Sequence, residues 1–241
     1  MDIRQETFTV KTYDCQSDGC IKVYSLMNYL QEAAAVHAEQ LGFGFARLNE
    51  IDSYWVLSNI KIEFTGFPKW NETITLRTWP SGHTRSIATR EFIGTNSAGC
   101  ELFKAGSEWM VLKKSTKRPR NISHLDLNLL HTGPQTISAN LKRLQPQETY
   151  AKTERLRVPY SSIDLNGHVN NAEYIRWAVD ALKSAFAFAG PIRCLQATYF
   201  REVFEGDDLD LLLGAEPNTG FHLLGKKSDD PTNVFAVLIR T

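Results

Sequence analysis

Apolar side chains recur every three to four residues along the segment between residues 170 and 190. They are Ala172, Ile175, Val179, Leu182 and Phe186. This spacing is typical of a helix with one buried face, and Asn170 or Asn171 is a suitable N-cap for it. Gly190 and Pro191 end the pattern. The segment is therefore predicted to form a long amphipathic helix.

Two further groups of segments have the composition and length of β-strands, and turn-rich stretches such as 95–99 and 228–233 separate their members. The first group is 54–64, 72–79, 84–94 and 101–112, and the second is 193–203, 208–216, 220–227 and 233–240. Each group follows a long helical segment. This order predicts the α+β class, with a helix packed on an antiparallel sheet.

The two halves of the chain are similar to each other. Residues 18–34 align without a gap with residues 166–182, at an offset of 166 − 18 = 148, and Gly19 then faces Gly167. In each half a short strand and a long helix precede the group of strands. We therefore interpret the sequence as an internal duplication.

The duplication predicts two domains of the same kind. We expect an N-terminal domain at residues 1–130, a connector at 131–148, and a C-terminal domain at 149–241. The stretch around the connector is rich in proline and polar residues, which suits an extended segment between two compact domains.

Composition excludes several classes of protein. The 241 residues are 42% hydrophobic and 22% charged, as in an ordinary globular protein, and 27 basic residues balance 27 acidic ones. No global charge favours nucleic acid or membrane surfaces, and no apolar run is long enough to span a bilayer. The four cysteines have neither zinc-site spacing nor the density of a disulfide framework. The sequence predicts a cytoplasmic protein without a metal.

Three polar residues, Asp164, Asn166 and His168, lie directly before the predicted helix. Backbone N–H groups and the helix dipole favour negative charge at such a position, and an acid and an amide beside a histidine suit catalysis. A turn that merely caps the helix would use the same residues. In the first half Gln16, Asp18 and Cys20 occupy the aligned positions, so only the second half is predicted to be active.

The stretch "DLNGHVNNAEYIRW" resembles the signature of the acyl-acyl carrier protein thioesterases, which have a double hotdog fold. The segments "YWVLSNIKIEF", "FPKWNETITLRTWP", "SEWMVLKKSTKRP" and "YFREV" follow in that family's order. The resemblance implies a tandem hotdog with four catalytic residues, Asp164, Asn166, His168 and Glu202. Plant members usually have cysteine after the glutamate, where this chain has Val203. At an offset of 202 − 64 = 138, Phe64 faces Glu202.

The resemblance also implies a reaction, the hydrolysis of a fatty acyl-acyl carrier protein thioester, without a cofactor. We expect Glu202 and Asp164 to activate and align water, His168 to relay a proton or polarise the carbonyl, and Asn166 to fix the orientation. The predicted oxyanion donors are the backbone N–H groups of Gly167, Val169 and Asn170. The N-terminal half is expected to shape the acyl pocket with aromatic residues in 42–48 and 54–57.

A basic run at residues 113–120 interrupts the otherwise neutral chain. Its cations are Lys113, Lys114, Lys117, Arg118 and Arg120. A solvated loop and a docking surface for the acidic carrier protein both explain it. A homodimer is an open alternative for the oligomeric state. An acyl-CoA thioesterase, another hotdog enzyme such as a hydratase, and a non-catalytic binding protein for acyl thioesters are the other functions to weigh.

Overall fold

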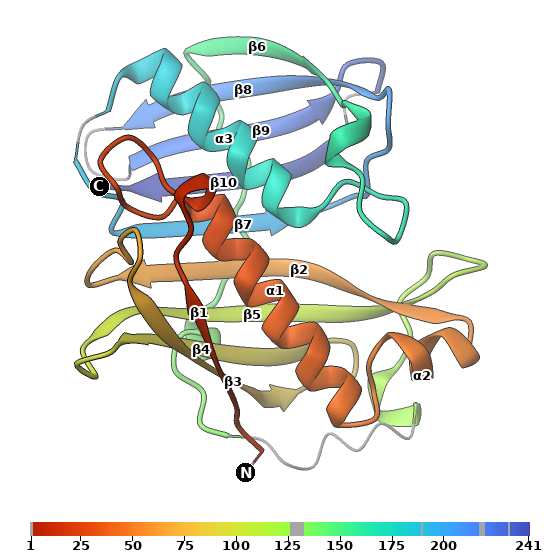
Figure 1. Cartoon of the computed structure of the whole chain (residues 1–241). Coiled ribbons are helices and arrows are strands. Elements are labelled where there is room, and N and C mark those ends of the chain that lie inside the picture. The colour runs from red at the N-terminus through yellow and green to blue at the C-terminus, as the bar shows by residue number, and fades with distance from the viewer. Residues whose placement is uncertain (1, 126–132, 189, 217–219, 231) are drawn as a thin grey trace. The chain divides into compact units, whose positions relative to one another are not determined.

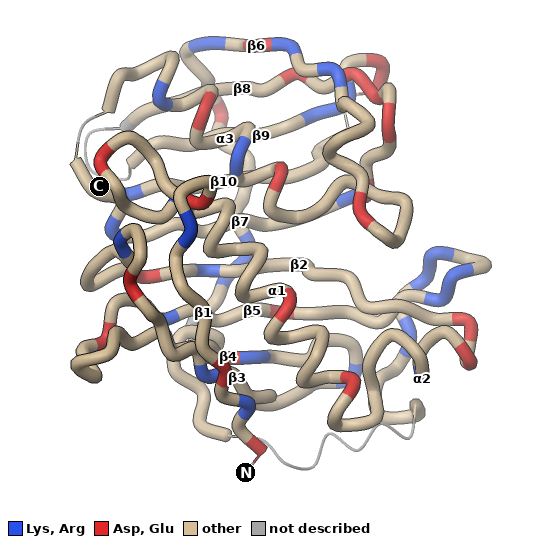
Figure 2. Tube along the Cα trace, in the orientation of Figure 1, with Lys and Arg blue, Asp and Glu red and all other residues tan. Residues whose placement is uncertain are grey.

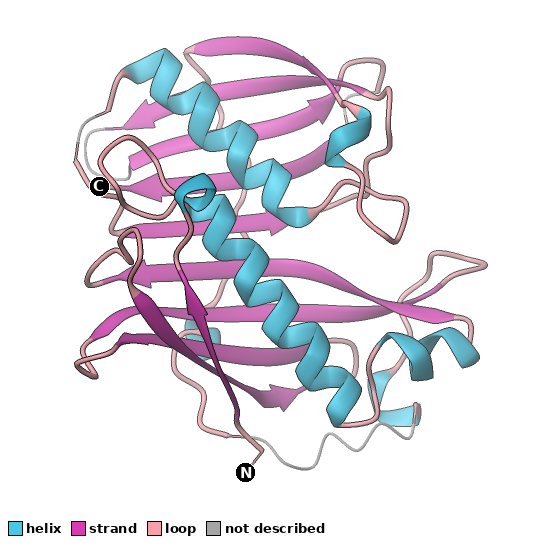
Figure 3. Cartoon of the chain, viewed as in Figure 1, coloured by secondary structure: helices cyan, strands magenta, loops and turns pink. Residues whose placement is uncertain are grey.

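The computed structural model divides the chain into two compact units, Met1–Leu141 and Lys142–Thr241. It describes residues 2–125, 133–188, 190–216, 220–230 and 232–241. Figures 1 and 3 show one long helix and an antiparallel sheet in each unit. The predicted α+β class is confirmed. The first predicted domain limit, at residues 130 and 131, lies outside the described residues, so the domain limits stay a prediction.

Unit 1 has a sheet in the order β1-β3-β4-β5-β2, and α1 contacts β1 and β3. Its elements are β1 (Arg4–Thr9), η1 (Thr12–Asp14), α1 (Val23–Gln40), α2 (Phe45–Glu50), β2 (Ser53–Phe64), β3 (Thr73–His83), β4 (Ala88–Asn96), β5 (Glu101–Lys113), η2 (Ile122–His124) and η3 (Ser138–Asn140). Leu26, Met27 and Leu30 of α1 are fully buried, as expected for the apolar face of a helix on a sheet.

Unit 2 has the sheet order β7-β10-β9-β8-β6, and α3 contacts β8, β9 and β10. Its elements are β6 (Lys152–Arg157), η4 (Tyr160–Ser162), α3 (Asn171–Phe186), β7 (Cys194–Tyr199), β8 (Asp208–Glu216), β9 (Gly220–Lys227) and β10 (Asn233–Arg240). Asn170 caps α3, because its side-chain oxygen accepts from the Ala172 N–H at 2.9 Å. The helix ends at Phe186, and its C-cap, Ala187, has a left-handed conformation three residues before Gly190.

Three of the predicted strands differ from the structure by more than one residue at an end. The strand expected at 72–79 is β3, which continues to His83. The strand expected at 84–94 is β4, which begins only at Ala88, because Thr84 and Ile87 close a turn before it. The strand expected at 193–203 is β7, which ends at Tyr199. Glu202 therefore lies in the loop after β7 and not on a strand. The short helix α2 was not predicted.

The aromatic residues that were expected to shape an acyl pocket have different environments. Phe43 is buried in a core cluster with Leu48 and Val111, and the Trp55 indole N–H donates to the Phe43 carbonyl at 2.8 Å. Phe45 is 54% exposed. Phe43 and Trp55 thus stabilise the packing of α2 on unit 1, and their part in an acyl pocket stays a prediction.

Candidate functional site

A tight turn positions the predicted site residues in front of α3. The Asp164 N–H donates to the His168 carbonyl at 2.8 Å, and Ile163 pairs with Val169 in an isolated bridge. Gly167 closes the turn with a φ of 77°, a conformation that strains residues with a Cβ. The turn therefore holds His168 at a defined place immediately before the helix.

His168 meets an acid from a distant part of unit 2. Its Nε2 atom lies 3.3 Å from Glu202 Oε2, and the two side chains are 16% and 21% exposed. The Val169 N–H donates to the Val203 carbonyl at 3.0 Å, which ties the loop of Glu202 to the turn of His168. The Phe204 ring lies 5.3 Å from the imidazole in an edge-on geometry. The pair is thus partly desolvated and can orient and exchange a proton.

Asp164 and Asn166 have other contacts in the structure. Asp164 Oδ1 accepts from the Asn166 backbone N–H at 2.8 Å, which is an Asx turn, and Asn166 is exposed. The Asx turn shows that Asp164 has the structural role expected of a capping turn. The Asp164 carboxylate caps the turn, and the His168 and Glu202 side chains contact each other beside it; the catalytic roles of the four residues stay a prediction.

The predicted oxyanion donors have carbonyl partners in the structure, and their part in catalysis stays a prediction. Gly167, Val169 and Asn170 donate their N–H groups to the carbonyl oxygens of Asp164, Val203 and Ser162, at 3.0, 3.0 and 2.9 Å. An N–H that already donates to a carbonyl cannot stabilise a developing oxyanion without losing that bond. In this arrangement the three groups maintain the turn.

Unit 1 contains the same turn. The Gln16 N–H donates to the Cys20 carbonyl at 2.9 Å, and Gly19 has a φ of 79°. Cys15 and Ile21 form the matching isolated bridge. Every one of these residues lies 148 positions before its counterpart, and α1 and α3 begin at Val23 and Asn171 with the same offset, since 171 − 23 = 148.

The loop after the site shows which residue of unit 1 corresponds to Glu202. The Ile21 N–H donates to the Pro68 carbonyl at 2.8 Å, as the Val169 N–H does to Val203, so the offset there is 203 − 68 = 135. Phe67 therefore faces Glu202, and the alignment with Phe64 was wrong. Between the helix and this loop the second half is shorter by 148 − 135 = 13 residues, whereas the alignment with Phe64 assumed 148 − 138 = 10.

Unit 1 has no counterpart of the histidine and glutamate pair at these positions, where it has Cys20 and Phe67. Burial raises the pKa of the Cys20 thiol, and the charge of Asp18 raises it further. A thiol with a raised pKa is a poor nucleophile at neutral pH. The turn of unit 1 therefore has the same backbone conformation as the turn of unit 2, but it has no side chains that correspond to the imidazole of His168 and the carboxylate of Glu202.

The basic turn, residues 113–120, divides into inward and outward side chains. Lys114 Nζ donates to Asn49 Oδ1 at 2.6 Å, and Arg120 Nη1 donates to the Ile51 carbonyl at 2.8 Å. Lys113, Lys117 and Arg118 are exposed, and Figure 2 shows the blue segments gathered beyond the end of β5. Lys117 Nζ also donates to the Tyr54 hydroxyl at 3.0 Å. Three of the five predicted cations, Lys114, Lys117 and Arg120, thus have structural contacts.

Within the described ranges, no group of three or more histidine, cysteine, aspartate or glutamate side chains could hold a metal ion. None of the helices described is both long and apolar enough to cross a membrane.

Two family models together match most of the chain. The model of the acyl-ACP thioesterase N-terminal domain matches residues 2–125, and that of the C-terminal domain matches residues 145–230. The chain is 26% identical over 230 residues to the chloroplastic oleoyl-acyl carrier protein thioesterase of Coriandrum sativum, across 88% of this chain and 62% of that protein. It thus spans about three-fifths of the length of such curated relatives.

Solved structures show the same double hotdog fold. An acyl-ACP thioesterase from Bacteroides thetaiotaomicron is similar with a TM-score of 0.86 and 26% identity, over 98% of this chain and 96% of that one. The 12:0-ACP thioesterase from Umbellularia californica has a TM-score of 0.87 at 20% identity, over 99% and 96% of the two chains. The predicted tandem hotdog is confirmed.

Proposed function

Because the chain belongs to the acyl-ACP thioesterase family, we propose that it hydrolyses the thioester of fatty acyl-acyl carrier protein and so ends acyl chain elongation. The observation that supports this most directly is the distance of 3.3 Å between His168 Nε2 and Glu202 Oε2, just before the N-terminus of α3. Hydrolysis needs a group that removes a proton from water, and this acid–base pair can supply it.

In the proposed reaction, water attacks the thioester carbonyl and the carbon–sulfur bond breaks. Glu202 accepts the proton of the attacking water, either directly or through His168. A thiol leaving group has a pKa of about 8.5, so it leaves readily and takes up a proton afterwards. Asn166, exposed on the same turn, is assigned to orienting the substrate.

Water, and not a thiol, is the proposed nucleophile. Val203 has no nucleophilic atom and is fully buried. Cys194 is the first residue of β7, whereas Glu202 follows the last residue of that strand, Tyr199. Six residues of strand extend over about 16 Å, so Cys194 lies far from the acid.

The proposal is tested with purified protein, fatty acyl-acyl carrier protein and a reagent that reports free thiol. The wild type should release thiol, and His168→Ala should lower kcat by about 10²- to 10⁴-fold, the usual contribution of a positioned acid or base. Cys20→Ala is the matched control, because Cys20 has the same place in the turn of unit 1, and it should keep its turnover. Equal losses in both variants, or no thiol release by the wild type, would refute the proposal.

The carrier protein is proposed to dock on the outward side chains of the basic turn. Lys113 and Arg118 are exposed, and the backbone N–H of Lys113 donates to the Arg118 carbonyl at 3.0 Å, so both belong to one hydrogen-bonded turn. Acyl carrier proteins are generally acidic, and complementary charge favours encounter and orientation.

The docking proposal is tested by the double reversal Lys113→Glu/Arg118→Glu. It should raise KM for the acyl-carrier substrate about tenfold, reduce its salt dependence, and leave a small acyl thioester unaffected. Lys142→Glu/Arg193→Glu makes the same change of net charge at two exposed residues of unit 2 and serves as control. A loss of the same size with both substrates would contradict docking.

An acyl-CoA thioesterase is the second candidate, since relatives of the hotdog fold reuse one framework for several chemistries. The same assay decides between them, because a CoA-specific enzyme would show a higher kcat/KM with acyl-CoA than with the carrier substrate. The cytoplasmic location and the homodimer stay predictions.

A further inference from the structure

Phe204 places an apolar ring beside the candidate site, at the surface of unit 2. Its ring centroid lies 5.3 Å from that of the His168 imidazole with an edge-on geometry, and the residue is 44% exposed. The turn before α3 exposes a second apolar residue, Leu165, which is 83% exposed. One exposed apolar side chain on a surface is ordinary, but here two belong to the turn and the loop that hold the histidine and glutamate pair.

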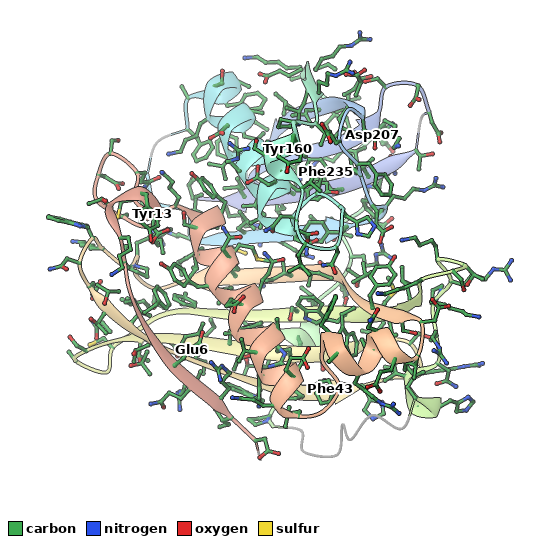
Figure 4. All side chains as sticks on the ribbon, turned by 45° about the vertical axis from the view of Figure 1, so that its right-hand side comes forward. Glu6, Tyr13, Phe43, Tyr160, Asp207 and Phe235 are labelled. Atoms are coloured by element: carbon green, nitrogen blue, oxygen red, sulfur yellow. The ribbon has the colours of Figure 1, made fainter. Side chains whose placement is uncertain are left out.

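Hydrogen bonds anchor the backbone of Phe204 on both sides. The Val203 carbonyl, one residue before it, accepts from the Val169 N–H at 3.0 Å. The Phe204 N–H donates to Asp207 Oδ2 at 3.0 Å, and the Asp207 N–H donates to the Phe204 carbonyl at 3.2 Å. Lys227 Nζ lies 3.0 Å from the same Asp207 oxygen, and Figure 4 shows Asp207, labelled, among the side chains of unit 2. The exposed ring therefore has a defined place beside the imidazole.

Unit 1 has a polar residue at the position of Phe204. Lys69 corresponds to it, since 204 − 69 = 135, the offset that the hydrogen bonds give for this loop. The isolated bridge between Cys20 and Lys69 supports this correspondence, because Cys20 has the place of His168. The residue beside the histidine position is thus a lysine in unit 1 and a phenylalanine in unit 2.

The turn shows the same difference between the units. Ser17 corresponds to Leu165, since 165 − 17 = 148, and both residues are exposed. Each unit forms the turn and its contact with the loop, so the backbone does not require an apolar side chain at either position. At both positions the apolar residue occurs in the unit that has the histidine and glutamate pair.

The charges of the loop disfavour an anionic ligand on the Phe204 ring. Residues 200–208 contain one cation, Arg201, and four acids, which are Glu202, Glu205, Asp207 and Asp208. Lys227 and Arg157 lie 3.0 and 3.7 Å from the last two of these acids, so acids still outnumber cations. A phosphate group or an acidic protein surface is repelled by such a loop. The ligand that suits it is uncharged.

We propose that Phe204 and Leu165 bind the pantetheine arm of the acyl thioester, which links the reacting sulfur to its carrier. Between its phosphate and its sulfur this arm is uncharged and consists of amide, methylene and methyl groups, so it suits apolar side chains among carboxylates. A bound acyl chain is wholly apolar and is buried, whereas Phe204 lies at the surface. The inference rests on the proposed function, because it states which part of that substrate contacts the site. It holds equally for acyl-CoA, which has the same arm.

The test compares two thioesters of one acyl group, S-acyl-pantetheine and the S-ethyl thioester, which lacks the arm. Phe204→Ala should raise KM for the pantetheine thioester about tenfold, the effect of burying roughly half of an aromatic side chain, and should change KM for the ethyl thioester less than about twofold. Phe204→Leu keeps an apolar contact and should restore most of the affinity. Trp70→Ala is the control, because Trp70 is an exposed aromatic residue on the corresponding loop of unit 1, and it should change neither KM.

Two results would overturn the inference. An unchanged KM for the pantetheine thioester in Phe204→Ala would show that the ring does not contact the arm. Equal changes with both thioesters would show that Phe204 acts on the acyl chain or on the geometry of the site.

A binding measurement separates this inference from the proposed function, which fails if the wild type releases thiol from neither thioester. S-alkyl-pantetheine is a thioether that cannot be hydrolysed, so titration calorimetry measures its Kd without any turnover. A Kd about tenfold higher in Phe204→Ala than in the wild type supports the contact, and equal Kd values contradict it.

Discussion

Glu91 of β4 and Gly106 of β5 are cross-strand neighbours, and both contact the segment 136–138 that follows unit 1's last strand. The buried Glu91 carboxylate accepts from the backbone N–H groups of Thr136, Ile137 and Ser138, at 3.2, 3.1 and 3.0 Å. A Cβ on Gly106 would lie 2.5 Å from the Ser138 nitrogen. One residue binds the segment, and the other leaves the space for it.

The first prediction follows from that contact. Gly106→Ala should lower the free energy of unfolding by about 1–3 kcal/mol, because the new methyl group forces the segment away from the sheet. Glu91→Gln should cost a similar amount or more, since its amide would point a donor at other donors. Urea unfolding measures both. Glu63→Gln, with a side chain that is 45% exposed, is the control and should change little. Stable Gly106→Ala protein would contradict the close approach.

The second prediction concerns pH. His37 is buried beside Arg90, with 3.0 Å between His37 Nδ1 and Arg90 Nη1. Burial, and then the charge of Arg90, lowers the pKa of His37 from 6.5 to about 4. The folded state therefore holds fewer protons than the unfolded state between these values. The contribution of neutral His37 to the free energy of unfolding should be fully present above pH 6.5. It should be lost as the pH falls towards 4, by on the order of 3 kcal/mol.

Urea unfolding between pH 4.5 and pH 7 measures this effect. His37→Gln is the comparison, because glutamine keeps an acceptor for Arg90 and does not titrate. The carboxylates titrate in both proteins, so the difference between the two curves isolates His37. Parallel curves would show that His37 is not kept neutral by folding.

A third prediction uses the two matched glycines, Gly19 and Gly167, whose φ values are 79° and 77°. An added Cβ meets no atom within 4 Å at either position, so only backbone strain should matter. Gly19→Ala and Gly167→Ala should each cost about 1 kcal/mol of stability. Only Gly167→Ala should also lower kcat, because its turn carries His168. Equal activity of the two variants in the thiol-release assay would count against a site at this turn.

The fourth prediction identifies the nucleophile. Glu202→Gln keeps the shape and hydrogen bonding of the side chain but removes the base, so most turnover should be lost. Cys194→Ala and alkylation of the thiols should leave turnover largely intact, and Val203→Cys should bring no gain. Mass spectrometry of the protein quenched during turnover checks this directly. An acyl group found on a cysteine would show that water is not the first nucleophile.

Local pattern in the sequence determined the two long helices, most strand limits and the internal duplication. The spacing of apolar residues predicted α3 and its Asn170 cap, because periodicity and capping depend on residues close together in the chain. The ungapped match of residues 18–34 with 166–182 likewise predicted two turns of the same form. In the structure the N–H groups of Gly19 and Gly167 make matching hydrogen bonds in these turns.

Only the tertiary structure decided which of the polar residues meet. His168 and Glu202 are 34 positions apart, since 202 − 168 = 34, and their contact depends on how the loop after β7 returns to α3. The same holds for the Phe67 correspondence and for the N–H group of Val169, whose partner, the Val203 carbonyl, lies in the docked loop. Such contacts join segments that no periodicity relates, because each depends on the packing of a whole unit.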